Sequence, residues 1–328
     1  MPTTSTMLAD HAIIVTGGAG FLGSAVVRRL VARGVPLARI IIPRSAVCDL
    51  RDRGAARALL RSTGATIVVH CAGAVGGLQA NRDQPARFFF DNAAMALSLI
   101  EEARGAWSDA GVLARSAFVQ VGSMTSYPEH APVPYREEAL WTGYPPQDSA
   151  PYAVAKLAAW QMLDAYHRQY ALRSAYVIPV NLYGPGDNIA DVRNAHVCGS
   201  LIKRFVDARR SNAPEVVCWG TGAPTREFLY IDDAADGCVR AAEHALAGTG
   251  EPVPMNLGTG SEISIKGLAE LIARSVGYPG RIVWDTSKPS GVARRTLDPS
   301  RARALMGWEA KMPLEAGLRS TIDWYESQ

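Results

Sequence analysis

The feature that most constrains the fold is a glycine-rich turn near the start of the chain, Gly17-Gly-Ala-Gly-Phe-Leu-Gly23. The apolar, β-branched residues 12–16 before the turn predict a short buried parallel strand. Residues 24–33 after it have helical character, and Gly34 is typical of a helix C-cap. Strand, glycine-rich turn and helix in this order form the context of a dinucleotide-binding site. A glycine loop without a ligand is the less favoured interpretation.

Each glycine of this turn has a physical reason to be there. Gly17 allows the tight turn, and Gly20 lets the backbone approach a pyrophosphate. Gly23 permits close packing of helix and strand. The free N–H groups at the start of the helix are donors for the anion. The turn therefore predicts a bound dinucleotide.

Strand and helix patterns alternate along the next 150 residues or so. We predict strands at 39–42, 66–70, 117–121 and 174–179. Between them we predict helices at 55–62, 88–104 and 151–170. Such alternation predicts an α/β fold, a Rossmann-type doubly wound parallel sheet. The pattern loosens after residue 183, as expected for a smaller C-terminal substrate-binding lobe. We predict a dinucleotide-binding Rossmann domain over 1–182, to which 226–258 returns, and a substrate-binding lobe over 183–225 and 259–328.

Composition narrows the class of protein. The chain has 328 residues, 48% hydrophobic and 20% charged, as in globular enzymes. Its net charge of +3 suits a small anionic substrate, and the arginines are scattered, so we expect no nucleic-acid partner. No apolar run is long enough for a bilayer and no signal-peptide pattern occurs, so we expect a cytoplasmic protein without a membrane partner. Five irregularly spaced cysteines predict reduced thiols and no metal site.

A second motif concerns chemistry. Tyr152-Ala-Val-Ala-Lys156 places a phenol and an ammonium four residues apart, on one face of a predicted helix. We expect the ammonium to lower the pKa of the tyrosine and so provide an acid or base near neutral pH, as carbonyl/alcohol redox chemistry requires. Alone, this pattern usually marks a solvated helix face. Combined with the dinucleotide turn, it predicts an oxidoreductase.

The end of the second strand bears on the cofactor. NAD-dependent enzymes usually place an acid there to hold the ribose hydroxyls. This chain instead reads Ile41-Ile-Pro-Arg44-Ser45, and both Arg44 and Ser45 could meet a 2′-phosphate. We therefore predict NADP (NADPH) rather than NAD. The alternative for Arg44 is a solvated surface arginine.

Further motifs lie along nearly the whole chain. They are Val75-Gly-Gly-Leu78, Gly122-Ser123 with Tyr127-Pro128, Pro151–Lys156, Pro179-Val-Asn-Leu-Tyr-Gly-Pro185 with Asp187-Asn188, Trp219-Gly-Thr-Gly222, Arg226-Glu-Phe-Leu-Tyr230 with Asp232-Asp233, and Ser287-Lys-Pro289. From about residue 13 to 325 the chain resembles the extended short-chain dehydrogenase/reductases, and among them the GDP-L-fucose synthase family. These enzymes are 3,5-epimerase/4-reductases of GDP-4-keto-6-deoxy-mannose.

The resemblance implies a role for each matching position. Ser123, Tyr152 and Lys156 would form the reductase triad, with Tyr152 protonating the C4 oxygen and Lys156 holding the nicotinamide ribose. The implied cofactor contacts are Gly17, Gly20, Phe21, Leu22, Gly23, Arg44, Ser45, Asp49, Leu50, Cys71, Ala72, Gly73, Lys156, Pro179, Asn181 and Leu182. The implied substrate contacts are Val75, Gly76, Gly77, Ser123, Met124, Asn181, His196, Arg204, Trp219, Arg226 and Lys288.

Some of these positions have a plainer interpretation. Trp219 could simply pack in the core, and Arg204 could lie on a solvated turn of helix. Ser123 could cap a loop at a strand end. The family also pairs two helices in a homodimer, and apolar residues recur along 88–100 and 155–166, so we expect a homodimer.

Two departures from the family pattern affect the reaction. In the bifunctional enzymes a cysteine and a histidine together move protons at C3 and C5 of the sugar. Thr125 occupies the position of that cysteine here. A threonine hydroxyl is far too weak an acid to replace a thiol. His196 matches the histidine, and Cys198 is a conceivable substitute base that more plausibly packs in the core. The family's Lys-Pro-Asp-Gly is Lys288-Pro-Ser-Gly291, which bears on the choice of nucleotide.

We therefore predict an NADPH-dependent nucleotide-sugar 4-ketoreductase, with a GDP-sugar favoured, that has lost full 3,5-epimerisation. The alternatives are a bifunctional epimerase/reductase, an NAD-dependent nucleotide-sugar epimerase and an NADP-binding regulatory protein without catalysis.

Overall fold

The computed structural model describes residues 7–189, 196–248, 251–288 and 292–328. Its centre is a six-stranded sheet with the strand order β10-β5-β4-β3-β1-β2. All neighbouring strands in it are parallel. The strands are β1 (Ile13–Thr16), β2 (Ile40–Ile41), β3 (Ile67–His70), β4 (Ala117–Val121), β5 (Ser174–Pro179) and β10 (Pro254–Leu257). This is the predicted Rossmann-type α/β fold.

The strand order locates the site. The chain runs from β1 to β2 on one side and then returns to β3 on the other side of β1. Between β1 and β3 the direction of winding therefore reverses, and ligands of open α/β sheets bind at the carboxyl ends of the strands at such a point. The glycine-rich turn follows β1, and Cys71-Ala-Gly73 follows β3.

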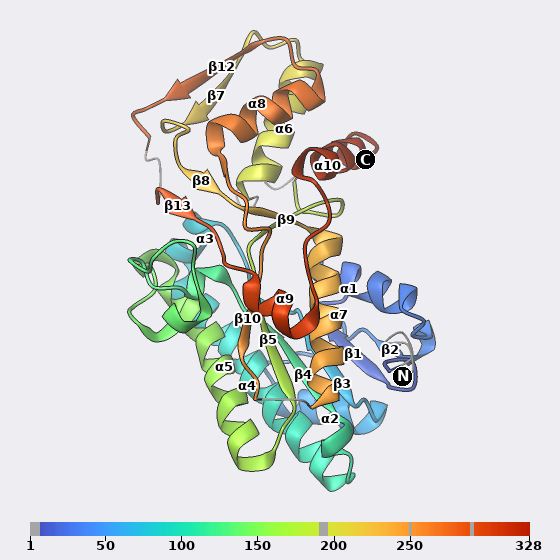
Figure 1. Cartoon of the computed structure of the whole chain (residues 1–328). Helices are drawn as coiled ribbons and strands as arrows, with labels where there is room; N and C mark the ends of the chain where they lie inside the picture. Colours follow the sequence, from blue (N-terminus) through green and yellow to red (C-terminus); the bar gives the residue numbers. More distant parts are fainter. Residues whose placement is uncertain (1–6, 190–195, 249–250, 289–291) are drawn as a thin grey trace.

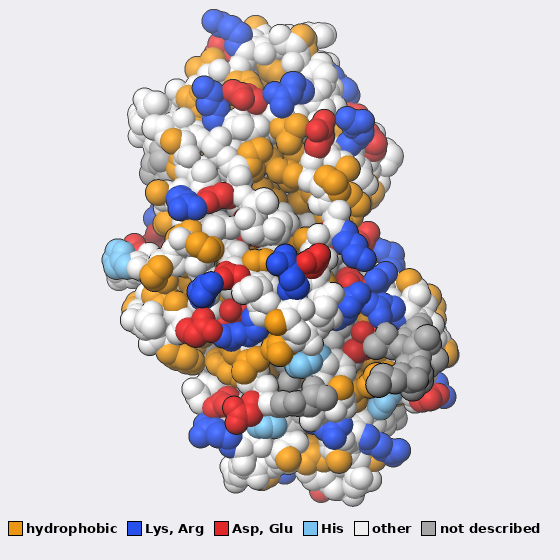
Figure 2. All heavy atoms as spheres, in the orientation of Figure 1, with side chains coloured by type: hydrophobic (Ala, Val, Ile, Leu, Met, Phe, Trp, Pro, Cys, Tyr) orange, Lys and Arg blue, Asp and Glu red, His pale blue; other side chains and the backbone are white. Residues whose placement is uncertain are grey.

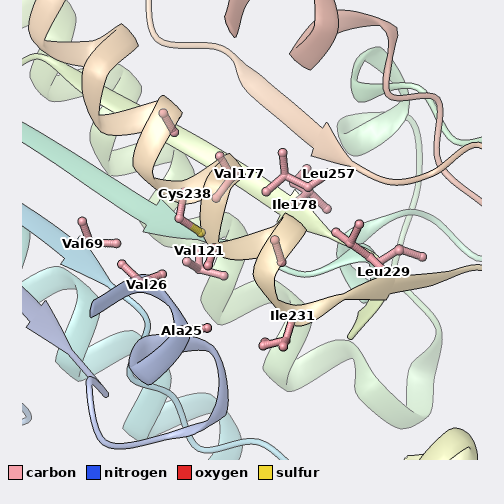
Figure 3. Close-up of a cluster of buried hydrophobic side chains, with 14 of the residues drawn as sticks. Ala25, Val26, Val69, Val121, Val177, Ile178, Leu229, Ile231, Cys238 and Leu257 are labelled. Carbon is pink, nitrogen blue, oxygen red and sulfur yellow. The ribbon is translucent and has the colours of Figure 1, made fainter. Parts of the chain in front are cut away.

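Helices cover both faces of this sheet (Figure 1). On one face α1 (Phe21–Ala32) packs beside α7 (Ile231–Ala247), which lies over β4 and β5. On the other face, α4 (Pro85–Asp109) packs against both α2 (Arg53–Thr63) and α5 (Ala150–Tyr170). Figure 3 shows the core beneath the first pair of helices, where buried side chains of α1, α7 and the central strands meet. Removal of this apolar surface from water is the main force that holds helices and sheet together.

Charged side chains join α1 to α7 at the rim of that core. The carboxylate of Asp236 accepts hydrogen bonds from Arg29, Arg33 and Arg240, and Arg33 also pairs with Glu243. Burial raises the pKa of Asp236, but the hydrogen bonds from the three arginines outweigh it and lower the pKa below its usual value. The helix that begins at the glycine-rich turn is thereby fixed to the sheet.

The remaining elements form the upper part of the molecule in Figure 1. They comprise a three-stranded sheet of the order β11-β8-β13, the parallel pairs β12-β7 and β6-β9, and the helices α6, α8 and α10. Their bounds are β6 (Asn181–Tyr183), α6 (Val197–Arg210), β7 (Glu215–Trp219), β8 (Thr225–Arg226), β9 (Phe228–Tyr230), β11 (Ile263–Ser264), α8 (Ile265–Val276), β12 (Arg281–Asp285), β13 (Arg294–Arg295) and α10 (Leu314–Glu326). Between β13 and α10, α9 (Ser300–Met306) packs on β10 and α7. The division into a Rossmann domain and a substrate-binding lobe at the predicted bounds stays a proposal.

The surface shows no large area of one charge on the face in Figure 2, where acidic and basic side chains are interspersed. Within the described residues, no helix is both long and apolar enough to cross a membrane.

Candidate active site

The glycine-rich turn is fixed by close backbone contacts. Gly17 has a φ of +66°, in the left-handed region that favours glycine. A Cβ placed on Gly17 would lie 2.8 Å from the nitrogen of Ala72, and one on Gly23 would lie 2.1 Å from the carbonyl oxygen of Gly17. Gly20 is the exposed N-cap of α1, without a side-chain cap. The first N–H groups of α1 are therefore free to bind an anion.

Hydrogen bonds join this turn to the end of β3. The Thr16 hydroxyl lies 2.7 Å from Nδ1 of His70 and accepts a hydrogen bond of 3.2 Å from the N–H of Ala72. Burial, with the nearby Lys156 charge, lowers the pKa of His70 to about 3, so its imidazole is neutral. The two backbone segments that flank the switch point are thus held together.

The predicted triad assembles at the ends of β4 and α5. Ser123 follows β4 as the N-cap of a short 3₁₀ helix, Met124–Ser126, and its hydroxyl lowers the pKa of the Tyr152 phenol. Tyr152 lies in the first turn of α5, and Lys156 follows one turn later. The Lys156 Nζ donates a hydrogen bond of 3.2 Å to the carbonyl oxygen of Val121 and lies 5.7 Å from the centre of the Tyr152 ring. The structure therefore brings Ser123, Tyr152 and Lys156 together.

The predicted effect of Lys156 on Tyr152 is wrong. Burial raises the pKa of Tyr152 to about 12, and the hydrogen bond from Ser123 only partly opposes this. Burial also lowers the pKa of Lys156 to about 8, and Cys71 partly opposes this. Both groups lose hydration, and the ammonium bonds Val121 rather than the phenol. Tyr152 is consequently protonated at neutral pH, which is the form that can donate a proton.

Asn92 was not predicted and lies beside this triad. Its Nδ2 donates hydrogen bonds to the carbonyl oxygens of Ala74 and Phe88. Its buried Oδ1 has no hydrogen-bond partner among the described residues. A Cβ on Gly73 would lie 3.0 Å from this Oδ1 and 3.6 Å from the Lys156 Nζ, so the two groups flank Gly73. A polar asparagine within the apolar stretch of α4 is the sequence signal that could have indicated it.

Of the remaining predicted cofactor residues, those near β2 differ in their surroundings. Arg44 and Ser45 are exposed, with no acid between β2 and Ser45. The Asp49 carboxylate pairs with Arg51 at 2.7 Å, which holds its pKa at about 2. Leu50 is buried in the core, so its side chain packs inward. Arg44 and Ser45 thus offer a cation and a hydroxyl to an anionic group, whereas Asp49 is an anion paired with Arg51 and Leu50 packs inward.

The predicted substrate residues lie mainly in the upper part of the molecule. Trp219 is 62% exposed, and the Arg204 guanidinium carbon lies 5.7 Å from the centre of its ring, so packing in the core is excluded. Asn181 donates a hydrogen bond to the carbonyl oxygen of Glu227, next to Arg226. Lys288 is exposed, and Pro289, Ser290 and Gly291 lie outside the described residues.

The position of the family cysteine is occupied by a hydrogen-bonded hydroxyl. The Thr125 Oγ1 lies 2.8 Å from the Oγ of Ser123. His196 is exposed at the N-cap of α6 and interacts electrostatically with Asp187. Cys198 is buried, which raises the pKa of its thiol far above the ordinary value. Cys198 is therefore poorly suited to act as a base.

A dinucleotide turn at the switch point, joined to a Ser-Tyr-Lys triad, defines the class of extended short-chain dehydrogenases/reductases. A family model described as "NAD dependent epimerase/dehydratase family" matches residues 13–258. The chain belongs to this family.

Three similar proteins extend the comparison. A probable GDP-L-fucose synthase of Oryza sativa subsp. japonica is 38% identical over 323 residues, which are 98% of this chain and 94% of the relative. The GDP-L-fucose synthase of Escherichia coli (strain K12) is 37% identical and covers 97% of both chains. A GDP-mannoheptose C4 reductase from Campylobacter jejuni, solved with NADP bound, has a TM-score of 0.83 at 26% identity and covers 96% of this chain and 98% of its own.

Proposed function

We propose that the protein is an NADPH-dependent nucleotide-sugar 4-ketoreductase that acts on an NDP-4-keto-6-deoxyhexose or a related sugar, with GDP favoured, without full 3,5-epimerisation. One observation carries the proposal: the Ser123-Tyr152-Lys156 triad is assembled, while the cysteine position holds Thr125, bonded to Ser123 at 2.8 Å. The names of the GDP-sugar synthases and reductases reported above support the reaction class and the nucleotide.

The residues divide the work of reduction. Tyr152 is protonated at neutral pH, as a phenol with a pKa of about 12 must be, and it donates the proton to the C4 oxygen as the ketone is reduced. Ser123 binds the same oxygen or the tyrosine hydroxyl, which fixes the direction of the proton transfer. Lys156 lies one helical turn further along α5 and would hold the nicotinamide ribose of the cofactor, as the family resemblance implies.

The residues fit a dinucleotide. A Cβ on Gly20 would meet only the carbonyl oxygen of Gly17, at 3.2 Å, which leaves the other side of the turn open to a pyrophosphate. Gly17, Gly20 and the first residues of α1 would hold the pyrophosphate, and Arg44 with Ser45 would hold a 2′-phosphate. The cofactor held there would supply the hydride for C4. The NADP in the Campylobacter jejuni structure supports this choice.

The loss of full epimerisation rests on proton chemistry. Inversion at C3 and C5 needs a group that removes a proton and one that returns it. The Thr125 hydroxyl has a far higher pKa than a thiol. The buried thiol of Cys198 has a raised pKa and is no better a base. His196 alone is left at the site to move a proton.

The test is reduction of GDP-4-keto-6-deoxy-mannose by NADPH in D₂O, followed by NMR of the product. Each inverted carbon would take up solvent deuterium, so we expect reduction at C4 with little deuterium at C3, at C5 or at both. Thr125→Cys should raise the exchange, and His196→Asn should abolish any exchange that remains. Stoichiometric deuterium at both carbons in the wild type would instead support a bifunctional epimerase/reductase.

Consumption of cofactor distinguishes the proposed reductase from an epimerase and from a regulatory protein. A reductase oxidises NADPH in proportion to product, an NAD-dependent epimerase recycles its cofactor, and a regulatory NADP-binding protein turns nothing over.

The exposed Phe89, Phe90 and Leu97 on α4 support the homodimer that we predict through α4 and α5. The cytoplasmic location stays a prediction.

A further inference from the structure

The hydroxyl of Ser123 makes two contacts with a single residue, Thr125. The backbone N–H of Thr125 donates a hydrogen bond of 3.2 Å to the Ser123 Oγ, and the Thr125 Oγ1 lies 2.8 Å from the same oxygen. Both contacts are possible because Ser123 is the N-cap of the short 3₁₀ helix that contains Thr125. The backbone of this turn therefore sets the spacing of the two hydroxyls.

The direction of the hydrogen bond between the two hydroxyls determines what Ser123 can do. A serine hydroxyl has one proton to donate and two lone pairs that accept. One lone pair of the Ser123 Oγ accepts the N–H of Thr125, and the bond to the Thr125 Oγ1 can run either way. If Ser123 were the donor, its proton would be used within the turn. If Thr125 is the donor, the Ser123 proton is directed out of the turn.

The groups that Ser123 serves in reduction require its proton. They are the C4 oxygen of the sugar ketone and the phenolic oxygen of Tyr152. A ketone oxygen only accepts hydrogen bonds, and so does the phenolate that remains after Tyr152 has given up its proton. The Ser123 hydroxyl lowers the pKa of Tyr152, as a donor to the phenolate does. Thr125 is therefore the donor in the hydrogen bond of 2.8 Å.

We propose that Thr125 is a positioning residue for the reduction: its hydroxyl donates to the Ser123 Oγ and thereby directs the Ser123 proton at the oxygen that gains negative charge. With both of its lone pairs engaged, the Ser123 hydroxyl is also a stronger donor, because hydrogen bonds in a chain polarise one another. The inference rests on the proposed function, and it gives the threonine a part in the reaction that remains.

The turn that carries the two hydroxyls is fastened to the helix of the proton donor. The N–H of Ser126 donates a hydrogen bond of 3.0 Å to the carbonyl oxygen of Ser123, which closes the turn. The Oγ of Ser126 is buried and donates a longer one of 3.5 Å to the carbonyl oxygen of Ala153, the residue after Tyr152. Thr125 can therefore orient Ser123 within a fixed frame, as precise positioning requires.

A thiol at position 125 would not orient Ser123 in this way. The S–H group is a weak hydrogen-bond donor, and a thiolate donates nothing. A cysteine that moves protons at C3 and C5 must pass through the thiolate form, in which the Ser123 Oγ has no side-chain donor at this position. The hydroxyl of Thr125 keeps its proton at any working pH. Threonine therefore favours reduction where a thiol would serve epimerisation.

The test compares three substitutions of Thr125 in the full-length protein with one control. Thr125→Ser keeps the hydroxyl and loses the methyl group, Thr125→Val keeps the branched shape and loses the hydroxyl, and Thr125→Cys introduces a thiol. The control Thr142→Val makes the same change at an exposed threonine whose hydroxyl bonds the carbonyl oxygen of Ala139. Single-turnover oxidation of NADPH with GDP-4-keto-6-deoxy-mannose gives the rate of reduction for each protein.

The hydroxyl and the shape of Thr125 predict opposite orders of rate. We expect Thr125→Val and Thr125→Cys to reduce the ketone about 3- to 10-fold more slowly than the wild type, the effect of one hydrogen bond, with an unchanged Kd for NADPH. Thr125→Ser and Thr142→Val should stay within about twofold of the wild type. If only the shape of the side chain mattered, Thr125→Val would be the faster enzyme and Thr125→Ser the slower, and that order would overturn the proposal.

A double-mutant cycle tests whether Thr125 acts through Ser123. Ser123→Ala removes the hydroxyl that Thr125 orients, so Thr125→Val added to it should change the remaining rate by less than about twofold. Equal slowing by Thr125→Val in both backgrounds, or no slowing in either, would refute the role of Thr125 while wild-type turnover still supports the reductase. If the wild type oxidises no NADPH with this substrate, the reductase assignment fails and the role of Thr125 fails with it.

Discussion

Replacing Lys156 by methionine should make the protein more stable and inactive. The Lys156 ammonium is buried, and burial lowers its pKa from 10.5 in an unfolded chain to about 8. At about 1.4 kcal/mol per pKa unit, carrying this charge at pH 7 costs roughly 3 kcal/mol of stability. Methionine has a similar length and no charge, but it leaves the carbonyl of Val121 without its donor, which costs about 1 kcal/mol. The expected net gain is roughly 2 kcal/mol.

The pH dependence gives the sharper test, and its sign follows from linkage. Between the folded pKa of about 8 and the unfolded value of 10.5, the unfolded chain binds more protons, so wild-type stability rises with pH relative to the variant. The advantage of Lys156→Met should therefore shrink by about 2 kcal/mol between pH 7 and pH 10. Urea unfolding of both proteins at the two pH values measures this.

A lysine on another helix serves as the control. Lys203 forms an i,i+4 pair with Asp207 at 2.7 Å, and the hydrogen bond that it donates to that carboxylate raises the pKa of the lysine. Lys203→Met should therefore lower stability by at most about 0.5 kcal/mol and keep that sign to pH 10. If Lys156→Met is less stable than the wild type at pH 7, or if its advantage is the same at both pH values, the buried ammonium does not carry the cost that we infer.

Four further predictions follow from other contacts. Tyr152→Phe should lower the rate of reduction by about 10²–10⁴ with NADPH binding retained, and near-normal turnover would remove Tyr152 from the role of acid. Gly23→Ala, whose Cβ would meet the Gly17 oxygen at 2.1 Å, should cost about 1–3 kcal/mol in urea unfolding and weaken NADPH binding; an unchanged protein would contradict the close packing. Asp236→Asn should lower the free energy of unfolding by about 3 kcal/mol, against at most about 1 kcal/mol for the exposed Asp232→Asn. The loss of stability in Asp236→Asn should vanish as pH falls through the lowered pKa of Asp236. Equal losses in the two variants would argue against the buried network. Sedimentation should give a dimer through α4 and α5, and a 35.1 kDa species at micromolar concentration would exclude it.

The sequence predicted the elements whose signals are local. The strands at 117–121 and 174–179 have the predicted bounds, because each is an apolar run enclosed by turn residues. The helix predicted at 88–104 extends to Pro85–Asp109, since helix ends carry weaker signals than the apolar stripe between them. The glycine-rich turn was predictable because only glycine tolerates its backbone angle and contacts.

The rest depends on residues brought together by the fold. The pKa of Tyr152 is raised because the structure buries the phenol, and no spacing in the sequence reports burial. Asn92 belongs to no motif of charge or spacing, and its importance follows from the hydrogen bonds to Ala74 and Phe88 that hold it beside Gly73.

The position of β10 has a consequence for how the protein is made. This strand completes one edge of the central sheet by pairing with β5, yet it starts only at Pro254. A nascent chain that has not reached it exposes β5, with its apolar Val177 and Ile178, as an open edge that can pair with other chains. The same chain lacks α7 until Ala247 is made, so β4 and β5 are uncovered on the face where α7 lies. The Rossmann sheet, although encoded first, is vulnerable to aggregation during most of synthesis, and an N-terminal fragment that ends before β10 should collect in inclusion bodies.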